Sequence, residues 1–335
     1  MDPSDHVTID TIRAAAERLR GVALETPLIP FETPAGRQIL LKAESLQAIG
    51  SFKIRGAYNA IAALGEAARS GGVVAASSGN HAQGVARAAR LFGIEATIVM
   101  PADAPAIKQA RVRADGARVI HWDPGRPSHA TPHEQAIALA AERGLPMIHS
   151  FDDDTVIAGQ GTVGLEVAAR VDDLAAVLVP IGGGGLIGGI ATAVRERHRN
   201  VRIVGVEPAL AADAQESFRT GRLVRWPTEL GRRTIADGTR VNLSERTFAY
   251  IRRLVDDIVT VEESEIMAAV RLVAERARIV AEPSGALTAA AVCFRSAEAG
   301  LDRLSGTVVA VISGGNLDTD RLRACLEAPI PNPPG

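Results

Sequence analysis

The sequence is poor in aromatic residues and cysteine, and each shortage excludes a class of protein. Aromatic residues make up 3% of the 335 positions although 47% are hydrophobic, and with 32 glycines this favours an aliphatic α/β core over a β-sandwich. The two cysteines, Cys293 and Cys325, show neither CxxC nor Cys/His spacing, so neither a disulfide framework nor a thiolate zinc site is supported. A reducing cytoplasm fits best.

An excess of one charge and a long apolar run are also missing. The formal net charge is −2 and the basic residues are scattered, so counterion release from nucleic acid has no basic patch to act through. No apolar run reaches the roughly 18 to 20 residues that span a bilayer. Residues 1–20 lack the basic start and apolar stretch of a signal peptide. We therefore expect a soluble protein whose partners include neither nucleic acid nor a membrane.

Length and patterning predict an α/β protein with two lobes. A chain of 335 residues exceeds what one hydrophobic core usually organises. Short β-branched runs alternate with segments of helical periodicity, which indicates mostly parallel sheets flanked by helices. The predicted strands are 73–76, 96–100, 117–122, 176–181, 201–206 and 307–312, and the clearest predicted helices are 82–92, 156–170 and 186–198.

Lys53 is a candidate nucleophile in the segment 51–57, SFKIRGA. A lysine forms an imine only when burial or neighbouring groups lower its pKa, and Phe52, Ile54 and Ala57 provide apolar neighbours. An isolated lysine is usually a solvated surface residue. The prediction for Lys53 therefore depends on the other motifs of the chain.

The segment 77–81, SSGNH, follows a predicted strand and opens a predicted helix. Backbone N–H groups at a helix start favour a carboxylate, and the serine and asparagine side chains add donors. An ordinary Ser/Asn N-cap is the alternative, and on this segment alone it is favoured.

Four consecutive glycines, 182–185, follow the predicted strand 176–181 and precede a helix. Such a turn lets the backbone wrap around a phosphate, whose charge the helix dipole favours. The same region contains a G-x-G-x-x-G pattern, Gly183, Gly185 and Gly188, with Glu207 ending the next strand. It keeps a nicotinamide-dependent oxidoreductase open as an alternative, although that function gives Lys53 no role.

A fourth glycine-rich turn, 313–316, SGGN, follows the very apolar strand 307–312. Ser313 places a hydroxyl where a bound ring would end. An ordinary glycine turn is the alternative at this position.

In this order, the four segments resemble the fold-type II enzymes of pyridoxal 5′-phosphate (PLP), specifically the serine/threonine dehydratase and serine racemase family. The resemblance covers roughly residues 9–318 and includes the stretches 156–162, 236–238, 254–258 and 282–286. It implies a fold like the tryptophan synthase β chain, with a large PLP-binding domain at 1–74 and 147–328 and a small mobile domain at 75–146 that grips the substrate. The proline-rich tail 329–335 is expected to be disordered.

The resemblance also implies residue roles. Lys53 holds PLP as a Schiff base, Phe52 lies against the ring, and Asn80 binds its phenolic oxygen. Ser313 contacts the pyridine nitrogen. The phosphate is held by Gly182, Gly183, Gly184 and Gly185, and the substrate carboxylate by Ser77, Ser78, Gly79, Asn80 and His81.

The implied reaction belongs to amino-acid metabolism: a lyase removes water and then ammonia from L-threonine or L-serine, giving 2-oxobutyrate or pyruvate. Lys53 takes the α-proton. A hydroxyl at Ser78, opposite Lys53, could return a proton with inverted configuration, so serine racemase and 3-hydroxyaspartate ammonia-lyase remain alternatives. The sequence FDD at 151–153 is similar to the threonine dehydratase form.

Two further expectations come from the resemblance. Glu207, the Ala211 carbonyl and Asp213 match the spacing of a divalent-cation site in this family, where oxygen ligands suit Mg²⁺ or Ca²⁺. Two carboxylates six residues apart are more often surface charges. A homodimer is expected from the same resemblance.

Overall fold

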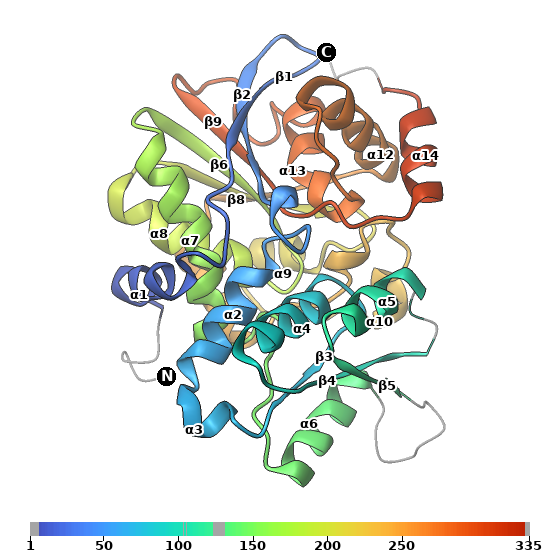
Figure 1. The fold of residues 1–335 in the computed structure, drawn as a ribbon. Helices are drawn as coiled ribbons and strands as arrows, with labels where there is room; N and C mark the ends of the chain where they lie inside the picture. The colour runs from blue at the N-terminus through green and yellow to red at the C-terminus, as the bar shows by residue number, and fades with distance from the viewer. Residues whose placement is uncertain (1–6, 103, 105, 123–130, 332–335) are drawn as a thin grey trace. The chain divides into compact units, whose positions relative to one another are not determined.

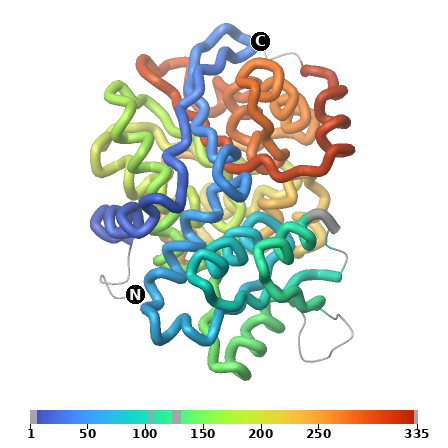
Figure 2. Tube along the Cα trace, in the orientation of Figure 1, coloured from blue at the N-terminus to red at the C-terminus, as the bar shows by residue number. Residues whose placement is uncertain are grey.

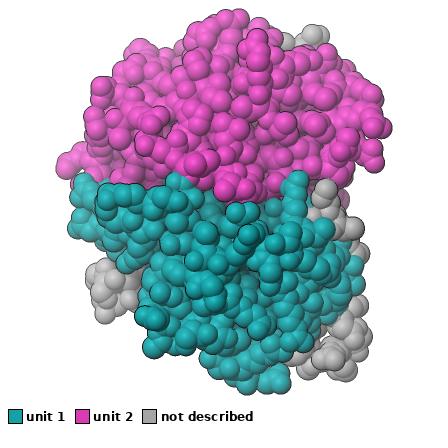
Figure 3. All heavy atoms as spheres, viewed as in Figure 1, with its two compact units in different colours: residues 1–23, 53–160 teal, residues 24–52, 161–335 magenta. Residues whose placement is uncertain are grey.

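The structure is a computed structural model that describes residues 7–102, 104, 106–122 and 131–331. Residues 1–6 at the N-terminus and 332–335 of the tail lie outside the described residues. The chain forms two compact units, unit 1 (residues 1–23 and 53–160) and unit 2 (residues 24–52 and 161–335), which Figure 3 colours separately. The chain therefore passes from one unit to the other three times. Within the described residues, no helix is both long enough and apolar enough to span a membrane.

Unit 2 contains a six-stranded sheet in the order β1-β2-β9-β6-β7-β8 (Figure 1). β1 and β2 pair antiparallel, and the other neighbouring strands pair in parallel. The strands are β1 (Leu28–Glu32), β2 (Gln38–Ala43), β6 (Leu174–Pro180), β7 (Arg202–Pro208), β8 (Asp257–Val261) and β9 (Thr307–Ile312).

The two faces of this sheet belong to two different cores. Along β6, Ala176 and Leu178 join one core, whereas Val177 and Val179 join the other, as the two-residue period of a strand requires. The first core includes α12 and α13, and every residue of α13 is buried. The second includes α8, α11 and the later part of α7. The helical elements of unit 2 are η2 (Glu44–Leu46), α8 (Gly185–Arg197), α9 (Asp213–Thr220), α10 (Thr228–Gly231), η3 (Asp237–Thr239), α11 (Glu245–Leu254), α12 (Glu263–Leu272), η4 (Val273–Ala277), α13 (Pro283–Phe294) and α14 (Thr319–Glu327).

Unit 1 contains a three-stranded parallel sheet in the order β3-β4-β5, and its path can be followed in the trace of Figure 2. A small core joins Val74 and Val99 of this sheet to Ala136 and Ala140 of α6. The elements are α1 (Ile9–Leu19), α2 (Lys53–Ala63), α3 (Gly65–Arg69), β3 (Val73–Ala76), α4 (Asn80–Phe92), β4 (Ala96–Pro101), α5 (Ala106–Ala114), β5 (Arg118–Trp122) and α6 (Pro132–Arg143); α7 (Asp154–Arg170) begins here and continues into unit 2.

The predicted α/β class with mostly parallel sheets is confirmed. All six predicted strands are present, and their ends agree with the structure to within two residues. The strands β1, β2 and β8 were not predicted. In β2 the reason is physical, because Lys42 interrupts the apolar pattern and yet is buried.

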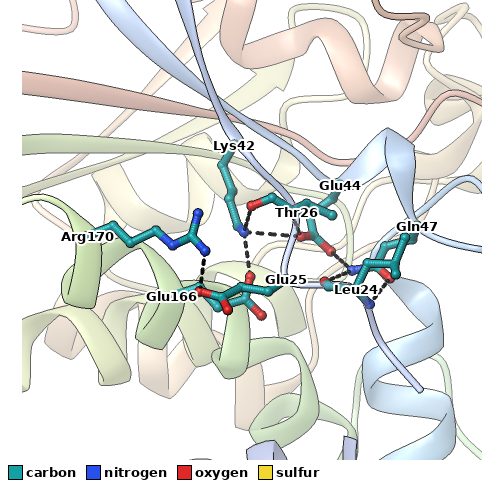
Figure 4. A network of polar contacts seen from close by, with 8 residues as sticks. All are labelled: Leu24, Glu25, Thr26, Lys42, Glu44, Gln47, Glu166 and Arg170. Atoms are coloured by element: carbon teal, nitrogen blue, oxygen red, sulfur yellow. Dashed lines mark hydrogen bonds and ion pairs between the residues drawn. The ribbon is translucent and has the colours of Figure 1, made fainter. Parts of the chain in front are cut away.

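Lys42 lies at the centre of a buried polar network in unit 2 (Figure 4). Its side chain is 1% exposed, and Nζ donates to the Thr26 carbonyl at 2.6 Å and to the Glu166 carboxylate. The Glu44 carboxylate lies 3.8 Å from Nζ and accepts from the Thr26 hydroxyl at 2.5 Å. A buried ammonium is tolerated here because carboxylates and a carbonyl surround it.

The network also includes the neighbouring chain segments. The Gln47 amide accepts from Leu24 N at 2.9 Å and donates to the Leu24 carbonyl at 2.7 Å, and Arg170 pairs with Glu25 at 2.8 Å. Figure 4 therefore shows three segments, 24–26, 42–47 and 166–170, joined by polar contacts. Each segment lies within about ten residues of a position where the chain passes between units.

We expect Lys42→Met to destabilise the protein by about 3–5 kcal/mol, because it leaves the carboxylates of Glu44 and Glu166 buried without their cation. Urea unfolding followed by circular dichroism measures the change. The double variant Lys42→Met/Glu166→Gln should recover part of the loss, since one of the two charges is removed. Equal stability of Lys42→Met and the unmodified protein would contradict this account of the network.

Candidate active-site residues

Lys53 is the first residue of α2 and belongs to unit 1. Its Nζ donates a hydrogen bond to the Ser150 carbonyl at 2.8 Å. Although part of the residue is accessible, burial lowers the pKa of the amine to about 8. A substantial uncharged fraction therefore exists at mildly alkaline pH, which is the form that attacks a carbonyl carbon.

The start of α2 is packed too closely for side chains at three glycines of unit 1. A Cβ on Gly84 of α4 would lie 3.0 Å from the Lys53 carbonyl oxygen, and one on Gly159 of α7 would lie 2.6 Å from that of Arg55. Gly56 donates its N–H to the Gln160 side chain at 3.1 Å, and a Cβ there would lie 2.3 Å from the same amide. The backbone that carries Lys53 is therefore held by helices on two sides.

In the same unit, residues 77–79 connect β3 to α4, and Asn80 and His81 are the first two residues of that helix. Gly79 occupies the N-cap of α4, and among the described residues no side chain caps this helix. The alternative of an ordinary Ser/Asn N-cap is therefore wrong; instead, the Ser77 hydroxyl accepts from Gly79 N at 3.1 Å. The first N–H groups of α4 have no acceptor within the helix, so this turn is suited to an anion.

His81 is buried one residue into α4. Its Nε2 lies 2.9 Å from the Ile148 carbonyl, a contact that requires the proton on Nε2. Burial, reinforced by the nearby charge of Lys53, lowers the pKa of His81 to about 3. Its ring is therefore neutral at physiological pH, with Nδ1 unprotonated.

In unit 2, Gly182, Gly183 and Gly184 connect β6 to α8, which begins at Gly185. Gly184 has φ +83°, and a Cβ there would lie 2.8 Å from Cβ of Thr247. A Cβ on Gly182 would lie 2.9 Å from Cα of Thr239. Glycine is thus required at both positions, and the turn presents backbone N–H groups at a helix start, as a phosphate site does.

Ser313 directly follows β9, and its hydroxyl lies 3.5 Å from the Ser284 carbonyl. Its own carbonyl accepts from Phe52 N at 3.1 Å, and Gly315 N donates to the Gly50 carbonyl at 2.9 Å. The structure therefore brings Phe52 and Ser313 together within unit 2, although they are far apart in sequence.

Glu207 and Asp213 form a buried acidic pair in unit 2. The Glu207 carboxylate accepts from the N–H groups of Ala214 at 3.1 Å and Gln215 at 2.7 Å, while Asp213 accepts from Leu243 N at 3.2 Å. Burial raises both pKa values, that of Asp213 to about 6, and the charge of Asp213 raises that of Glu207 further. The described residues contain no cluster of three or more His, Cys, Asp or Glu side chains that could hold a metal ion.

The chemistry of these groups fits PLP. Unit 1 provides an amine of lowered pKa for the aldehyde and a helix start for a carboxylate. Unit 2 provides a glycine turn for the phosphate, a phenyl ring and a neutral hydroxyl.

Sequence reasoning missed Ser150, whose carbonyl accepts from Lys53, and His149, whose Nδ1 accepts from Phe151 N and Asp152 N. No motif marks either residue, because a backbone group takes part in each of these hydrogen bonds. A usable signal for Lys53 itself was the scarcity of lysine, since the chain has only Lys42, Lys53 and Lys108.

Comparisons with known proteins agree with this chemistry. The family model described as "Pyridoxal-phosphate dependent enzyme" matches residues 19–314. An L-threonine ammonia-lyase of Geobacter sulfurreducens is 43% identical over 94% of this chain and 77% of its own, and an L-threo-3-hydroxyaspartate ammonia-lyase of Pseudomonas sp is 41% identical over 95% and 98%. The solved structure of maize serine racemase has a TM-score of 0.87 and 36% identity, covering 95% of this chain and 96% of that one.

The nicotinamide alternative is therefore wrong, and the resemblance identified from the motifs is confirmed. The chain belongs to the fold-type II pyridoxal-phosphate dependent enzymes, in the family of serine/threonine dehydratases and serine racemases.

Proposed function

We propose that this enzyme removes water and then ammonia from a small β-hydroxy amino acid, with L-threonine and L-serine as its substrates. The observation that carries the proposal is the Lys53 amine, whose pKa burial lowers to about 8 and whose position the Ser150 carbonyl holds. An amine of this kind serves both as a carbonyl nucleophile and, once released, as a base.

In the proposed arrangement Lys53 binds PLP covalently, Gly182–Gly185 hold its phosphate, and Phe52 and Asn80 contact its ring. When bound, PLP withdraws electrons from the α-carbon of the substrate. The Ser313 hydroxyl would contact the pyridine nitrogen and, being neutral, would stabilise a protonated ring less than a carboxylate would.

Side chains and backbone groups of the protein then bind the substrate and transfer protons. Ser77, Gly79 and the first N–H groups of α4 bind the substrate carboxylate. The uncharged Lys53 amine removes the α-proton, and the resulting ammonium is suited to protonate the departing β-hydroxyl. Residues 75–146 would act as the mobile part that grips the substrate, and 1–74 with 147–328 as the cofactor-binding part.

The two histidines near Lys53 are uncharged in the protein without substrate. The pKa of His81 is lowered to about 3 and that of His149 to about 4, both chiefly by burial. Neither ring is therefore a cation that could neutralise a second substrate carboxylate at physiological pH.

A second candidate function is racemisation of serine or elimination from 3-hydroxyaspartate. It is favoured by Ser78, whose hydroxyl could return a proton to the face opposite Lys53. Relatives named for 3-hydroxyaspartate and for threonine differ by only two percentage points in identity to this chain, so identity does not separate the candidates.

We also propose that Glu207, the Ala211 carbonyl and Asp213 bind Mg²⁺ or Ca²⁺. Two buried carboxyls repel each other when ionised, and a divalent cation would offset both charges. A cytoplasmic location is proposed because both cysteines are reduced and buried, and a homodimer because of the family resemblance.

Lys53→Ala should abolish covalent cofactor binding and lower 2-oxo acid release from threonine by at least about 1,000-fold, because both nucleophile and base are lost. Borohydride reduction followed by peptide mass spectrometry locates the fixed cofactor. Lys108→Ala is the matched control and should behave like the unmodified enzyme. Cofactor fixed to the chain of the Lys53→Ala variant would refute the proposal.

Ser78→Ala should leave 2-oxo acid release within about tenfold of the unmodified enzyme while removing the formation of D-serine, since only the second proton donor is lost. Chiral chromatography of the serine remaining during turnover measures this. If the unmodified enzyme yields no D-serine from L-serine, the racemase candidate fails.

Metal-stripped protein should lose stability as the pH rises from about 4 to about 6. The unfolded chain releases the Asp213 proton near its ordinary pKa of 3.8, whereas the folded protein retains it up to about 6, so ionisation disfavours the fold. Thermal melting with EDTA, and then with Mg²⁺ or Ca²⁺, tests this. The cation should restore stability at pH 7, and Asp213→Asn should remove the cation's effect; identical curves with EDTA and cation would exclude the metal.

A further inference from the structure

The segment 146–152 of unit 1 connects the small sheet to α7. Its beginning pairs with β3, because Val74 N donates to the Pro146 carbonyl at 3.0 Å and Ile148 N donates to the Val74 carbonyl at 2.8 Å. The backbone is therefore anchored up to Ile148. Beyond Ile148 the chain turns and leads to Asp154, the first residue of α7.

Two carbonyls of this segment each hold a polar side chain near the start of α2 and α4. The Ile148 carbonyl lies 2.9 Å from His81 Nε2, and the Ser150 carbonyl accepts from Lys53 Nζ at 2.8 Å. The two carbonyls belong to residues two apart, so their directions depend on the conformation of the residue between them. That residue is His149.

His149 closes the turn through its own side chain. Its Nδ1 accepts from Phe151 N at 3.2 Å and from Asp152 N at 2.8 Å. The ring contacts Phe151 and His133 of α6 edge-on, each at a centroid distance of 4.8 Å. The Ser150 carbonyl and the Phe151 N–H belong to one trans peptide plane and point in opposite directions, so the hydrogen bond from Phe151 N to Nδ1 determines where this carbonyl points.

Burial keeps the ring of His149 neutral. Burial is the largest cause that lowers its pKa, to about 4, and His133 and Lys53 lower it further, against the opposing effect of Asp152 and Asp153. At neutral pH Nδ1 is therefore a hydrogen-bond acceptor, as its two contacts require.

We propose that His149 is the positioning residue for Lys53: its Nδ1 shapes the 150–152 turn, and the turn directs the Ser150 carbonyl to the Lys53 amine. The same conformation keeps the proton of His81 on Nε2 through the Ile148 carbonyl. This inference deepens the proposed function, and its catalytic part rests on that function. The hydrogen bonds of the 146–152 segment do not depend on it.

The test measures the pKa of the Lys53 amine in the full chain without cofactor. Competitive labelling with acetic anhydride across pH 6 to 11, resolved by peptide mass spectrometry, reports Lys53, with Lys108 as the reference in the same chain. In the unmodified protein the pKa should lie near 8. His149→Ala removes a carbonyl that favours the ammonium but also opens the turn to water, and because burial is the cause of the lowered pKa, the entry of water should dominate and raise the pKa by at least about one unit.

Two polar variants separate positioning from bulk packing. In His149→Asn the amide oxygen can occupy the place of Nδ1 and accept the same N–H groups, so the pKa should stay near 8. In His149→Gln the oxygen lies further out, so this variant should resemble His149→Ala. His133→Ala removes a ring contact but no acceptor, and it should leave the pKa unchanged.

The holoenzyme provides the second readout. His149→Ala should lower 2-oxo acid release by on the order of 100-fold, as misplacement of a reacting group does, and His149→Asn should restore most of it. An unchanged Lys53 pKa in His149→Ala, or equal values in the Asn and Gln variants, would overturn the inference. Failure of the proposed function would appear as cofactor fixed to a residue other than Lys53. The two failures are distinguishable, because the labelling experiment uses protein without cofactor.

Discussion

The close contact between α2 and its neighbouring helices is the constraint on which the chemistry of unit 1 depends. Gly84 and Gly159 let the backbones of α4 and α7 approach the first turn of α2 to distances at which any side chain would collide with a carbonyl oxygen. The amine of Lys53 is buried because this turn is enclosed. Burial in turn lowers its pKa, so helix packing and reactivity are consequences of the same contacts.

The polar groups of the two units occupy similar positions relative to their strands and helices. The positions proposed to bind anions lie at helix starts that follow parallel strands: α4 after β3 and α8 after β6. Neutral groups surround the amine, since burial keeps His81 and His149 uncharged. A nucleophile in such surroundings keeps its lone pair, whereas nearby carboxylates would favour the ammonium.

Many of the strands and turns were predictable from the sequence, because they depend on residues that are neighbours in the chain. Strands such as β3 and β9 are short apolar runs beside turn residues. The four consecutive glycines at 182–185 were recognisable because a purely structural turn seldom needs so many. The strand β2 was missed because Lys42 is neutralised by Glu166, 124 positions later. Gly84 and Gly159 lie inside helices that glycine disfavours, and only the distances to α2 explain them. His149 acts through backbone hydrogen bonds, which leave no periodic pattern in the sequence.

The three segments around Lys42 have a consequence for how this architecture can be recombined. The chain passes between unit 1 and unit 2 three times, and the segments beside those passages are joined by one set of polar contacts around the buried Lys42. A chimera that takes unit 1 from a relative must place its junctions outside 24–26, 42–47 and 166–170, or import all three together. Evolution faces the same requirement, because replacing one partner leaves an uncompensated charge in the interior. Substitutions at these positions are therefore expected to occur together during evolution, even where other interior residues change one at a time.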